Sequence, residues 1–392
     1  MKQYLRVLLQ KSFVGTLLFI SVALLGCSGA TNDPSVTPDM SEAQVDFAPE
    51  LTVVEIATVE QPTPQSTTAP TPLTNYTNGP LQGNGAHHDS APSLPEIFFP
   101  ESMKPDVSPV TYLNNPCQHL ENRLGEEKST PGTVVVPIMF HSIVQPDRPI
   151  NDTTSITTAY FEKFMETAAE LGFSTITTQE LVGFLDHNQA IPERSMLLIL
   201  DDRRPGVTEL FMPYLEDMDW TLTLGWIAAD STRDSVWETM TDLASTGRLD
   251  VQSHGYNHIY IQDYISTAQI EEELYKPIEV IEARFGTRPI AHVWPGGNFD
   301  ERAIAMATEA GYQVGFTVYS RGPIMYNWIP LGEPEMAMAA PLMVLPRFWS
   351  TVAVQALEEA VMVSEAAKKF YSAIETAERE YYLYYCLPEG SH

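Results

Sequence analysis

Basic residues are scarce in this sequence. Among its 392 residues, 22 are lysine or arginine and 51 are aspartate or glutamate, so the formal net charge is −29. Nucleic acids and anionic membrane surfaces are negatively charged and would repel such a chain, which argues against both as partners. A neutral or cationic partner, such as a glycan with free amines, fits the charge better.

Long hydrophobic runs are missing after the first 25 residues, so no later segment is a candidate membrane span. The early run, residues 13–25, follows Lys2, Arg6 and Lys11 and is shorter than the roughly 20 residues that cross a bilayer. A basic start followed by a short apolar run is typical of a signal peptide, which we assign to residues 1–26.

The apolar run ends in Leu24-Leu25-Gly26-Cys27, which resembles the lipobox of bacterial lipoproteins. In that motif a small residue precedes the cysteine that is lipidated and becomes the new N-terminus. The alternative is a short buried helix with an accidental cysteine. The position of the apolar run near the N-terminus, the basic residues before it and Gly26 favour lipidation of Cys27. The sequence therefore predicts an extracytoplasmic lipoprotein anchored to the cell membrane.

Apolar periodicity is absent from residues 27–132, which hold about half of the 30 prolines among Thr, Ser, Asn and acidic residues. Such a segment cannot bury enough surface to offset the entropy of ordering it, so we predict a disordered tether that holds the rest of the chain away from the lipid. His87 and His88 lie within it and are interpreted as solvated, because a mobile segment preorganises no metal site.

Cysteines are few, at three. Once Cys27 is lipidated, Cys117 and Cys386 remain in a compartment that permits a disulfide. A bridge would fasten the end of the tether to the C-terminal segment. Two unpaired thiols in peripheral segments are the equal alternative.

From residue 133 the pattern becomes ordered. Short β-branched runs alternate with helical stretches, which is typical of βαβ units around a parallel sheet or barrel, so the fold class is α/β. We place the folded domain at residues 133–350 and a C-terminal helical extension at residues 351–392. The strands are expected at 134–140, 196–200, 221–227, 249–252, 290–294, 313–318 and 342–345. The helices are expected at 161–171, from a capping box at 177–180, and at 270–285, 301–310 and 352–385.

Polar residues follow three of these strands where each one ends. His141 follows the first, Asp201 and Asp202 the second, and the pair His254 and His258 a later one. The carboxyl ends of the strands in an α/β barrel converge on the face that holds the active site. The sequence therefore predicts that these side chains collect at one site.

Each of these pieces has an alternative interpretation. Two adjacent aspartates often serve as a helix cap and a solvated neighbour, and two histidines four apart can simply share one face of a turn. Together, Asp202, His254 and His258 provide one carboxylate and two imidazoles, the composition of a catalytic metal site with open positions. Asp201 would then act as the base that activates water.

Asp201-Asp202 after an apolar strand and His254-x-x-x-His258 resemble the first two motifs of the polysaccharide deacetylases, the NodB-like domain of carbohydrate esterase family 4. The resemblance covers residues 134–349 and implies a distorted (β/α) barrel that hydrolyses acetyl groups on glycans. It also implies that Asp202, His254 and His258 hold Zn²⁺ or a similar divalent ion, with Asp201 as base. The backbone N–H of Gly296 would stabilise the oxyanion.

Residues 136–142 and 171–177 resemble the branch of biofilm poly-N-acetylglucosamine deacetylases. In that branch the histidine after the first strand serves as general acid, which implies this role for His141. Amide cleavage needs a proton on the leaving nitrogen, and the late leucine-x-histidine motif of most of the family has no histidine here, at residues 344–348. His292 lies inside its expected strand and should face packing. A histidine that only caps the strand end is the alternative for His141.

The sequence departs from the family pattern at several positions. Arg203 follows the two aspartates where glycine is usual, and Gly255 stands where serine or threonine is usual. The third motif lacks its arginine and aromatic residue, because Val293 and Gly296 occupy those places. Arg347, near the last expected strand, is a candidate substitute for that arginine.

Several aromatic residues near these loops could stack on sugar rings or only fill the core and rim: Tyr256, Trp294, Tyr319 and Trp349. The predicted function is metal-dependent hydrolysis of acetyl groups from an N-acetylated polysaccharide, by a hydrolase of carbon–nitrogen bonds other than peptide bonds. The alternative is a non-catalytic glycan-binding lipoprotein on a degenerate deacetylase scaffold.

Overall fold

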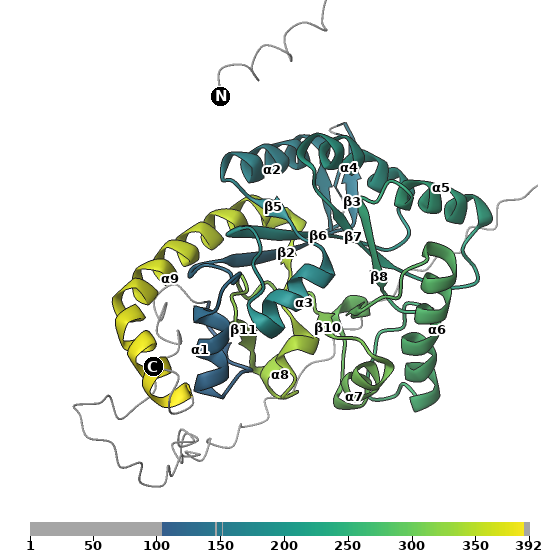
Figure 1. Cartoon of the computed structure of the whole chain (residues 1–392). Helices are drawn as coiled ribbons and strands as arrows, with labels where there is room; N and C mark the ends of the chain where they lie inside the picture. Colours follow the sequence, from purple (N-terminus) through teal and green to yellow (C-terminus); the bar gives the residue numbers. More distant parts are fainter. Residues whose placement is uncertain (1–103, 146, 151, 388–392) are drawn as a thin grey trace, which may run out of the picture. The chain divides into compact units, whose positions relative to one another are not determined.

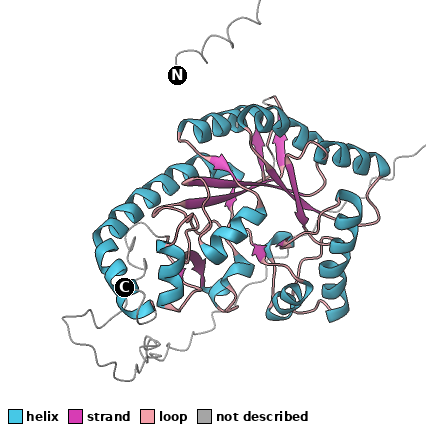
Figure 2. Ribbon diagram, viewed as in Figure 1, coloured by secondary structure: helices cyan, strands magenta, loops and turns pink. Residues whose placement is uncertain are grey.

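A curved parallel sheet forms the centre of the protein. The computed structural model describes residues 104–145, 147–150 and 152–387, and in them eight strands form a sheet in the order β10-β9-β8-β7-β6-β2-β12, with β5 beside β6. Figure 2 shows the strands in magenta, with helices in cyan around them. The predicted α/β class is confirmed. The strands are β2 (Val134–Phe140), β5 (Ser174–Thr175), β6 (Arg194–Asp201), β7 (Leu222–Trp226), β8 (Leu249–Ser253), β9 (Ala291–Val293), β10 (Val314–Phe316) and β12 (Phe348–Trp349).

One short segment joins the two ends of this strand order. The Leu345 N–H donates to the Gly315 carbonyl at 2.8 Å, and the Leu345 carbonyl accepts from the Thr317 N–H at 2.9 Å, both at the end of β10. Three residues later β12 pairs in parallel with β2 at the other end of the order. The sheet is therefore closed on itself, which confirms the expected distorted (β/α) barrel.

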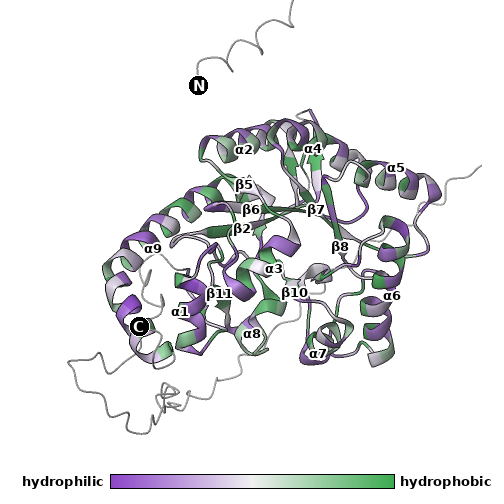
Figure 3. Cartoon of the chain, viewed as in Figure 1, coloured by the Kyte–Doolittle hydropathy of each residue, from purple (hydrophilic) through white to green (hydrophobic). Residues whose placement is uncertain are grey.

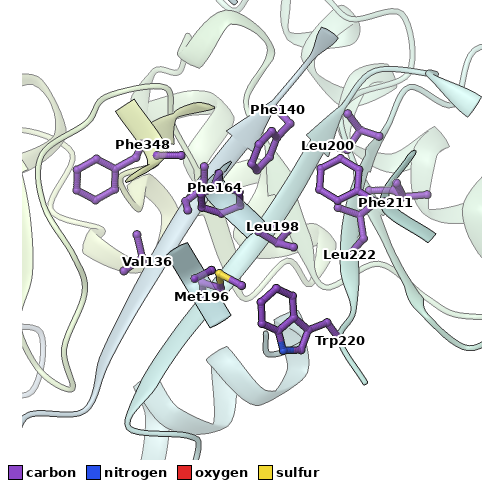
Figure 4. Close-up of a cluster of buried hydrophobic side chains, with 14 of the residues drawn as sticks. Val136, Phe140, Phe164, Met196, Leu198, Leu200, Phe211, Trp220, Leu222 and Phe348 are labelled. Atoms are coloured by element: carbon purple, nitrogen blue, oxygen red, sulfur yellow. The ribbon is translucent and has the colours of Figure 1, made fainter. Parts of the chain in front are cut away.

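The strands are buried on both faces, as parallel strands inside a ring of helices must be. Every residue of β2 is buried, and its side chains alternate between two apolar clusters, with Val134, Val136 and Ile138 in one and Val135 in the other. Figure 4 shows the first cluster, in which Phe140 of β2 lies near Phe164, a residue that a helix supplies. In Figure 3 the central strands are mostly green, while the surrounding helices also carry purple segments.

Helices surround this sheet (Figure 1). The predicted capping box is confirmed, because the Thr177 side chain accepts from the Glu180 N–H and the Glu180 side chain accepts from the Thr177 N–H. The helix at 301–310 has its predicted bounds, whereas α4 and α5 were not predicted. The helices are α2 (Thr158–Glu170), α3 (Thr178–His187), α4 (Pro205–Met218), α5 (Asp234–Ala244), α6 (Thr267–Phe285), α7 (Glu301–Ala310), α8 (Glu333–Met336) and α9 (Ala353–Tyr381).

The predicted end of the tether at residue 132 is wrong. Residues 107–110 form strand β1 (Val107–Val110), which pairs antiparallel with β11 (Ile329–Gly332), and helix α1 (Pro116–Leu124) follows. Long-range contacts, which a local pattern does not reveal, order this part. The Asn327 side chain, for example, accepts from the N–H groups of Tyr112 and Leu113 at 3.0 and 2.7 Å. The signal peptide, Cys27, the histidines at 87 and 88 and tether residues 27–103 lie outside the described residues.

The two cysteines near the ends of the described chain form a disulfide. Cys117 of α1 and Cys386, in the π-helical turn after α9 (Tyr382–Cys386), are bridged, with Cα atoms 5.2 Å apart. In Figure 1 α1 lies beside the end of α9. The sequence left a disulfide and two unpaired thiols equally open, and the structure contains the disulfide.

The expected strand at 342–345 is also wrong. Residues 341–344 form a 3₁₀ helix (Pro341–Val344) that begins with proline, and the nearby strand is β12. Met343 and Val344 are buried in this helix as they would be in a strand. A short apolar run does not distinguish the two conformations, which explains the error.

Helix α9 belongs to the same packed unit as the barrel. It covers the expected stretch at 352–385 up to Tyr381, and Ala356, Leu357 and Ala360 pack into the cluster that contains β2. The described residues on both sides of the expected boundary at residue 350 belong to one unit, so the boundary separates no second domain. Within the described ranges, no helix is both long and apolar enough to cross a membrane. Two short parallel strands, β3 (Ser142–Val144) and β4 (Ser155–Thr157), lie apart from the main sheet.

Candidate metal centre

The polar residues predicted to share a site converge at the carboxyl ends of β2, β6 and β8. Asp201 is the last residue of β6, and Asp202 follows with a positive φ of 71°. His254 follows β8, and His258, at φ 61°, turns back toward it. Both positive φ values are uncommon for residues with a side chain, and such strain is concentrated at functional sites.

Asp202, His254 and His258 bring three ligand atoms together. The Nε2 atoms of the two histidines lie 3.1 Å apart. Asp202 Oδ1 is 3.9 Å from His254 Nε2 and 3.8 Å from His258 Nε2. Ligand atoms on one zinc ion lie about 2.0–2.2 Å from it, so any two of them are at most about 4.4 Å apart. All three separations meet this limit, and the residues therefore fit a single divalent ion.

The protonation of the two histidines also suits a metal. His254 Nδ1 lies 2.8 Å from the Val293 carbonyl, which can only accept, so Nδ1 carries the proton and Nε2 keeps its lone pair. Burial, with a further contribution from His254, lowers the pKa of His258 to about 4. His258 is therefore neutral at pH 7, the form that binds a metal.

Arg204 fixes the remaining oxygen of Asp202. Its Nε and Nη2 atoms donate to Asp202 Oδ2 at 3.0 and 2.6 Å, and its Nη1 donates to Ser142 Oγ at 2.7 Å. Burial would raise the pKa of Asp202, but His254 and Arg204 outweigh it and lower this pKa. Oδ1 is left to face the histidines. Arg203, which departs from the family pattern, donates instead to Thr232.

Asp201 is paired with Arg347, the residue proposed to replace the missing arginine. Arg347 Nη1 donates to Asp201 Oδ1 at 2.7 Å, and Arg347 Nε donates to the Thr317 carbonyl at 2.7 Å. Burial raises the pKa of Asp201, but Arg347 and the nearby histidines lower it more, to about 2. Gly225 on β7 makes room for this carboxylate, since a Cβ there would lie 3.0 Å from Asp201 Oδ1.

His141 lies on the other side of Asp201. Its Nε2 is 3.6 Å from Asp201 Oδ2, and its ring stacks on Trp349 of β12 with centroids 6.2 Å apart. Its Nδ1 is buried and has no hydrogen-bond partner in the described structure. Burial lowers the pKa of His141, partly opposed by Asp201. The predicted packing of His292 is observed, because it is buried with Nδ1 3.1 Å from Ser253 Oγ.

Gly296 lies in a short 3₁₀ turn after β9 (Pro295–Gly297), with a positive φ of 60°. A Cβ at Gly296 would meet the ring of Tyr260 at 3.0 Å. That ring also packs edge-on against His258, with centroids 5.4 Å apart. Tyr260 therefore contacts both Gly296 and His258. Its ring occupies the space that the side chain of an aromatic residue at position 296 would enter.

The aromatic candidates divide into two groups. Tyr256 and Trp294 are buried, so they pack in the core and cannot stack on a sugar. Trp349 is half-buried and Tyr319 exposed. Tyr260, with 47% of its surface exposed, was not among the predicted residues. Its position depends on the turn of the histidine loop, which no spacing in the sequence reveals.

Comparison with known proteins finds one family. Residues 188–315 match the model of the polysaccharide deacetylase family. This segment contains Asp201, Asp202, His254, His258 and Gly296, whereas His141 and Arg347 lie outside it. A Bacillus subtilis (strain 168) protein named "Putative polysaccharide deacetylase YxkH" is 22% identical over 185 residues, which cover 46% of this chain and 63% of that protein.

Solved structures are also similar to the chain. The Streptococcus pyogenes deacetylase PplD in complex with acetate is 18% identical, with a TM-score of 0.49, and the match covers 59% of this chain and 99% of that one. IcaB from Ammonifex degensii is 16% identical, with a TM-score of 0.46, and the match covers 60% of this chain and 99% of that one.

Proposed function

The chain belongs to the polysaccharide deacetylase family, and from this premise we propose that it hydrolyses acetyl groups of an N-acetylated polysaccharide with the help of a divalent metal ion, most simply Zn²⁺. One observation carries the proposal. A ligand triad, an ionised buried carboxylate and a half-buried histidine meet at one end of the barrel. This combination supplies a base and an acid next to each other and beside a site for a Lewis acid.

Asp202, His254 and His258 would hold the ion, which polarises the acetyl carbonyl and lowers the pKa of water when bound. Asp201 is the base. Arg347 occupies its Oδ1 and keeps it ionised, so Oδ2 remains to accept a proton from water. Arg347 thus takes over the part of the arginine that is missing from the third motif.

His141 is the general acid that delivers a proton to the leaving nitrogen. Because burial lowers its pKa, the ring must first take up that proton, and the nearby Asp201 carboxylate favours this protonated form. The Nε2 atom of His141 lies beside Asp201 Oδ2, so acid and base can work on the same tetrahedral centre. Trp349 stacks on the ring and limits its orientation. The Gly296 N–H would complete the site by donating to the oxyanion; this role rests on the family resemblance and on the contact with Tyr260.

The substrate that suits this site is a neutral or partly cationic glycan. A net charge of −29 disfavours polyanions. Tyr260 packs against His258 and Trp349 against His141, and aromatic rings beside a site commonly stack on sugar rings. The lipid anchor at Cys27 and the tether would place the domain outside the cytoplasm, within reach of such a polymer.

The test compares two acetyl substrates in one variant. We expect the full-length protein to release acetate from N-acetylated glucosamine oligosaccharides. His141→Ala should lower this rate by roughly 10²–10⁴-fold, the usual contribution of a general acid. Hydrolysis of 4-nitrophenyl acetate should fall less than about 10-fold, because nitrophenolate leaves without a proton.

The matched control is His187→Ala, an exposed histidine on α3. It should behave like the wild type with both substrates. Equal losses with amide and ester in His141→Ala would contradict the acid role. A wild-type protein that binds the oligosaccharides but releases no acetate would support the glycan-binding alternative instead.

A further inference from the structure

The histidine loop, residues 254–258, has a conformation that its own sequence does not favour. Gly255 has a φ of 80° and His258 a φ of 61°, and the latter is uncommon for a residue with a side chain. His258 is also 29% exposed, so surrounding packing alone does not hold its ring. The position of this proposed ligand therefore depends on what stabilises the loop backbone.

A buried carboxylate on helix α6 supplies that stabilisation. Glu273 is 1% exposed, and its side chain reaches back under the loop. Its Oε1 accepts from the Asn257 N–H at 2.6 Å, and its Oε2 accepts from the N–H groups of Tyr256 and Ile259 at 3.1 and 3.2 Å. These donors flank His258 on both sides along the chain. Successive backbone N–H groups that converge in this way form a nest that binds an anion.

Gly255 makes the contact possible. A Cβ at this position would lie under 3.0 Å from Glu273 Oε2, so any side chain at residue 255 would displace the carboxylate. This accounts for one departure from the family pattern, the glycine that replaces the usual serine or threonine. Gly255 and Glu273 therefore act as one unit. Because Gly255 has no side chain, the Glu273 carboxylate of α6 has room to accept hydrogen bonds from the loop.

We propose that Glu273 is a positioning residue of the metal centre, which holds His258 in its ligating position through the backbone of the histidine loop. The inference rests on the proposed metal site, but it concerns a residue that touches neither metal nor substrate. Groups that orient a metal ligand typically change metal affinity 10–100-fold when they are removed. Glu273 acts on the main chain of the loop, while His254 is oriented independently by the Val293 carbonyl.

The experiment measures zinc affinity of the metal-stripped full-length protein by competition with a chromophoric chelator. Glu273→Gln keeps one acceptor oxygen but presents an amide to N–H donors, and it should weaken zinc binding about 10-fold. Glu273→Ala should weaken it about 100-fold. The Co²⁺ form of each variant should show an altered d–d absorption spectrum, which a purely structural role elsewhere would not change.

The matched control is Glu272→Gln on the same helix. Glu272 pairs with Lys276 one turn away and is partly exposed, so its loss should leave zinc affinity and the Co²⁺ spectrum unchanged. Gly255→Ala provides a second route, because its methyl group displaces the Glu273 carboxylate without altering it. This variant should weaken zinc binding to a similar degree, and adding Glu273→Ala to it should cause little further loss.

The possible failures are distinguishable. Wild-type affinity in both Glu273→Ala and Gly255→Ala would overturn the positioning role while leaving the metal site intact. Fully additive losses in the double variant would overturn the claim that the two residues act as one unit. A wild-type protein that binds no zinc would instead remove the proposed metal centre itself.

Discussion

The carboxylate of Asp201 is 1% exposed, and burial alone would keep such a group protonated and useless as a base. Arg347 reverses this effect with a hydrogen-bonded charge at 2.7 Å. The arginine is itself fully buried, and its Nε is bound to the Thr317 carbonyl, so its planar fork is held in one orientation. The ionisation of the proposed base therefore depends on one residue of the segment that closes the barrel.

Replacing Arg347 with lysine should move the pH profile of acetate release. A pKa of about 2 leaves Asp201 ionised throughout the working pH range. A lysine has a single ammonium group and cannot donate to Asp201 and to the Thr317 carbonyl in the same geometry as the guanidinium. Burial would then raise the pKa of Asp201. The acidic limb of kcat/KM should shift upward by about one pH unit or more, since the base works only when it is deprotonated.

The control for this change is Arg123→Lys. Arg123 forms a similarly buried pair with Glu378, at 3.0 Å, between α1 and α9. Its replacement should lower the melting temperature without moving the pH profile. An Arg347→Lys profile that coincides with that of the wild type would contradict the assignment of Arg347 to the base.

Residues with a local signature could be predicted, and residues with a tertiary role could not. Asp202, His254 and His258 follow strands, so the convergence of strand ends predicts their meeting. Arg347 could be named only as a candidate, because its contact depends on how residues 345–349 cross between β10 and β2. Glu273 was missed, since a glutamate on an amphipathic helix looks the same whether it faces water or a backbone nest.

Among the elements, α1 and β1 show how a segment without apolar periodicity becomes ordered. The Asn115 side chain caps α1 by accepting from the N–H groups of Cys117 and Gln118, and Pro116 occupies the first turn, where a missing N–H is harmless. β1 gains backbone hydrogen bonds from β11. The disulfide then ties α1 to the turn after α9. Each of these contacts except the cap joins residues more than 200 positions apart.

Loss of this disulfide should destabilise the fold without emptying the metal site. The bridge closes a loop with a sequence separation of 269, for which the entropic model gives about 4 kcal/mol or more. In the double variant Cys117→Ser/Cys386→Ser we expect the melting temperature to fall by about 10 °C. Zinc stoichiometry at 25 °C should not change, because neither cysteine is near the ligand triad.

Reductant provides the control. It should lower the melting temperature of the wild type to that of the double variant and leave the variant unchanged. A melting temperature in the variant within about 1 °C of the oxidised wild type would show that the bridge does not contribute to stability.

The elements differ in how well the sequence predicts them. The strand at 134–140 has its predicted bounds, because four of its seven residues (Val134, Val135, Val136 and Ile138) are β-branched and favour a strand. The run at 342–345 is as apolar but begins after Pro341 and coils into a 3₁₀ helix. Helices α4 and α6 contain Pro213 and Pro277. The helix at 270–285 was predicted despite its proline, whereas α4 was not predicted.

At the scale of the whole molecule, barrel closure assembles the site. The proposed base, acid and metal ligands, together with Arg347, come from segments that span most of the folded chain, from His141 to Arg347. No part of the barrel contains all of them, and the family model itself matches only residues 188–315. The lipid anchor at Cys27 and the extracytoplasmic location stay predictions from the first 27 residues.

We expect acetate release to depend on a metal ion held by Asp202, His254 and His258. The most direct measurement titrates metal-stripped full-length protein with zinc and follows bound zinc and acetate release from N-acetylated glucosamine oligosaccharides together. We predict that release rises with bound zinc and saturates at one zinc per chain. His258→Ala should bind little zinc and release little acetate, while His187→Ala matches the wild type. Acetate release by zinc-free wild type at the loaded rate, or a full zinc complement in His258→Ala, would contradict the account.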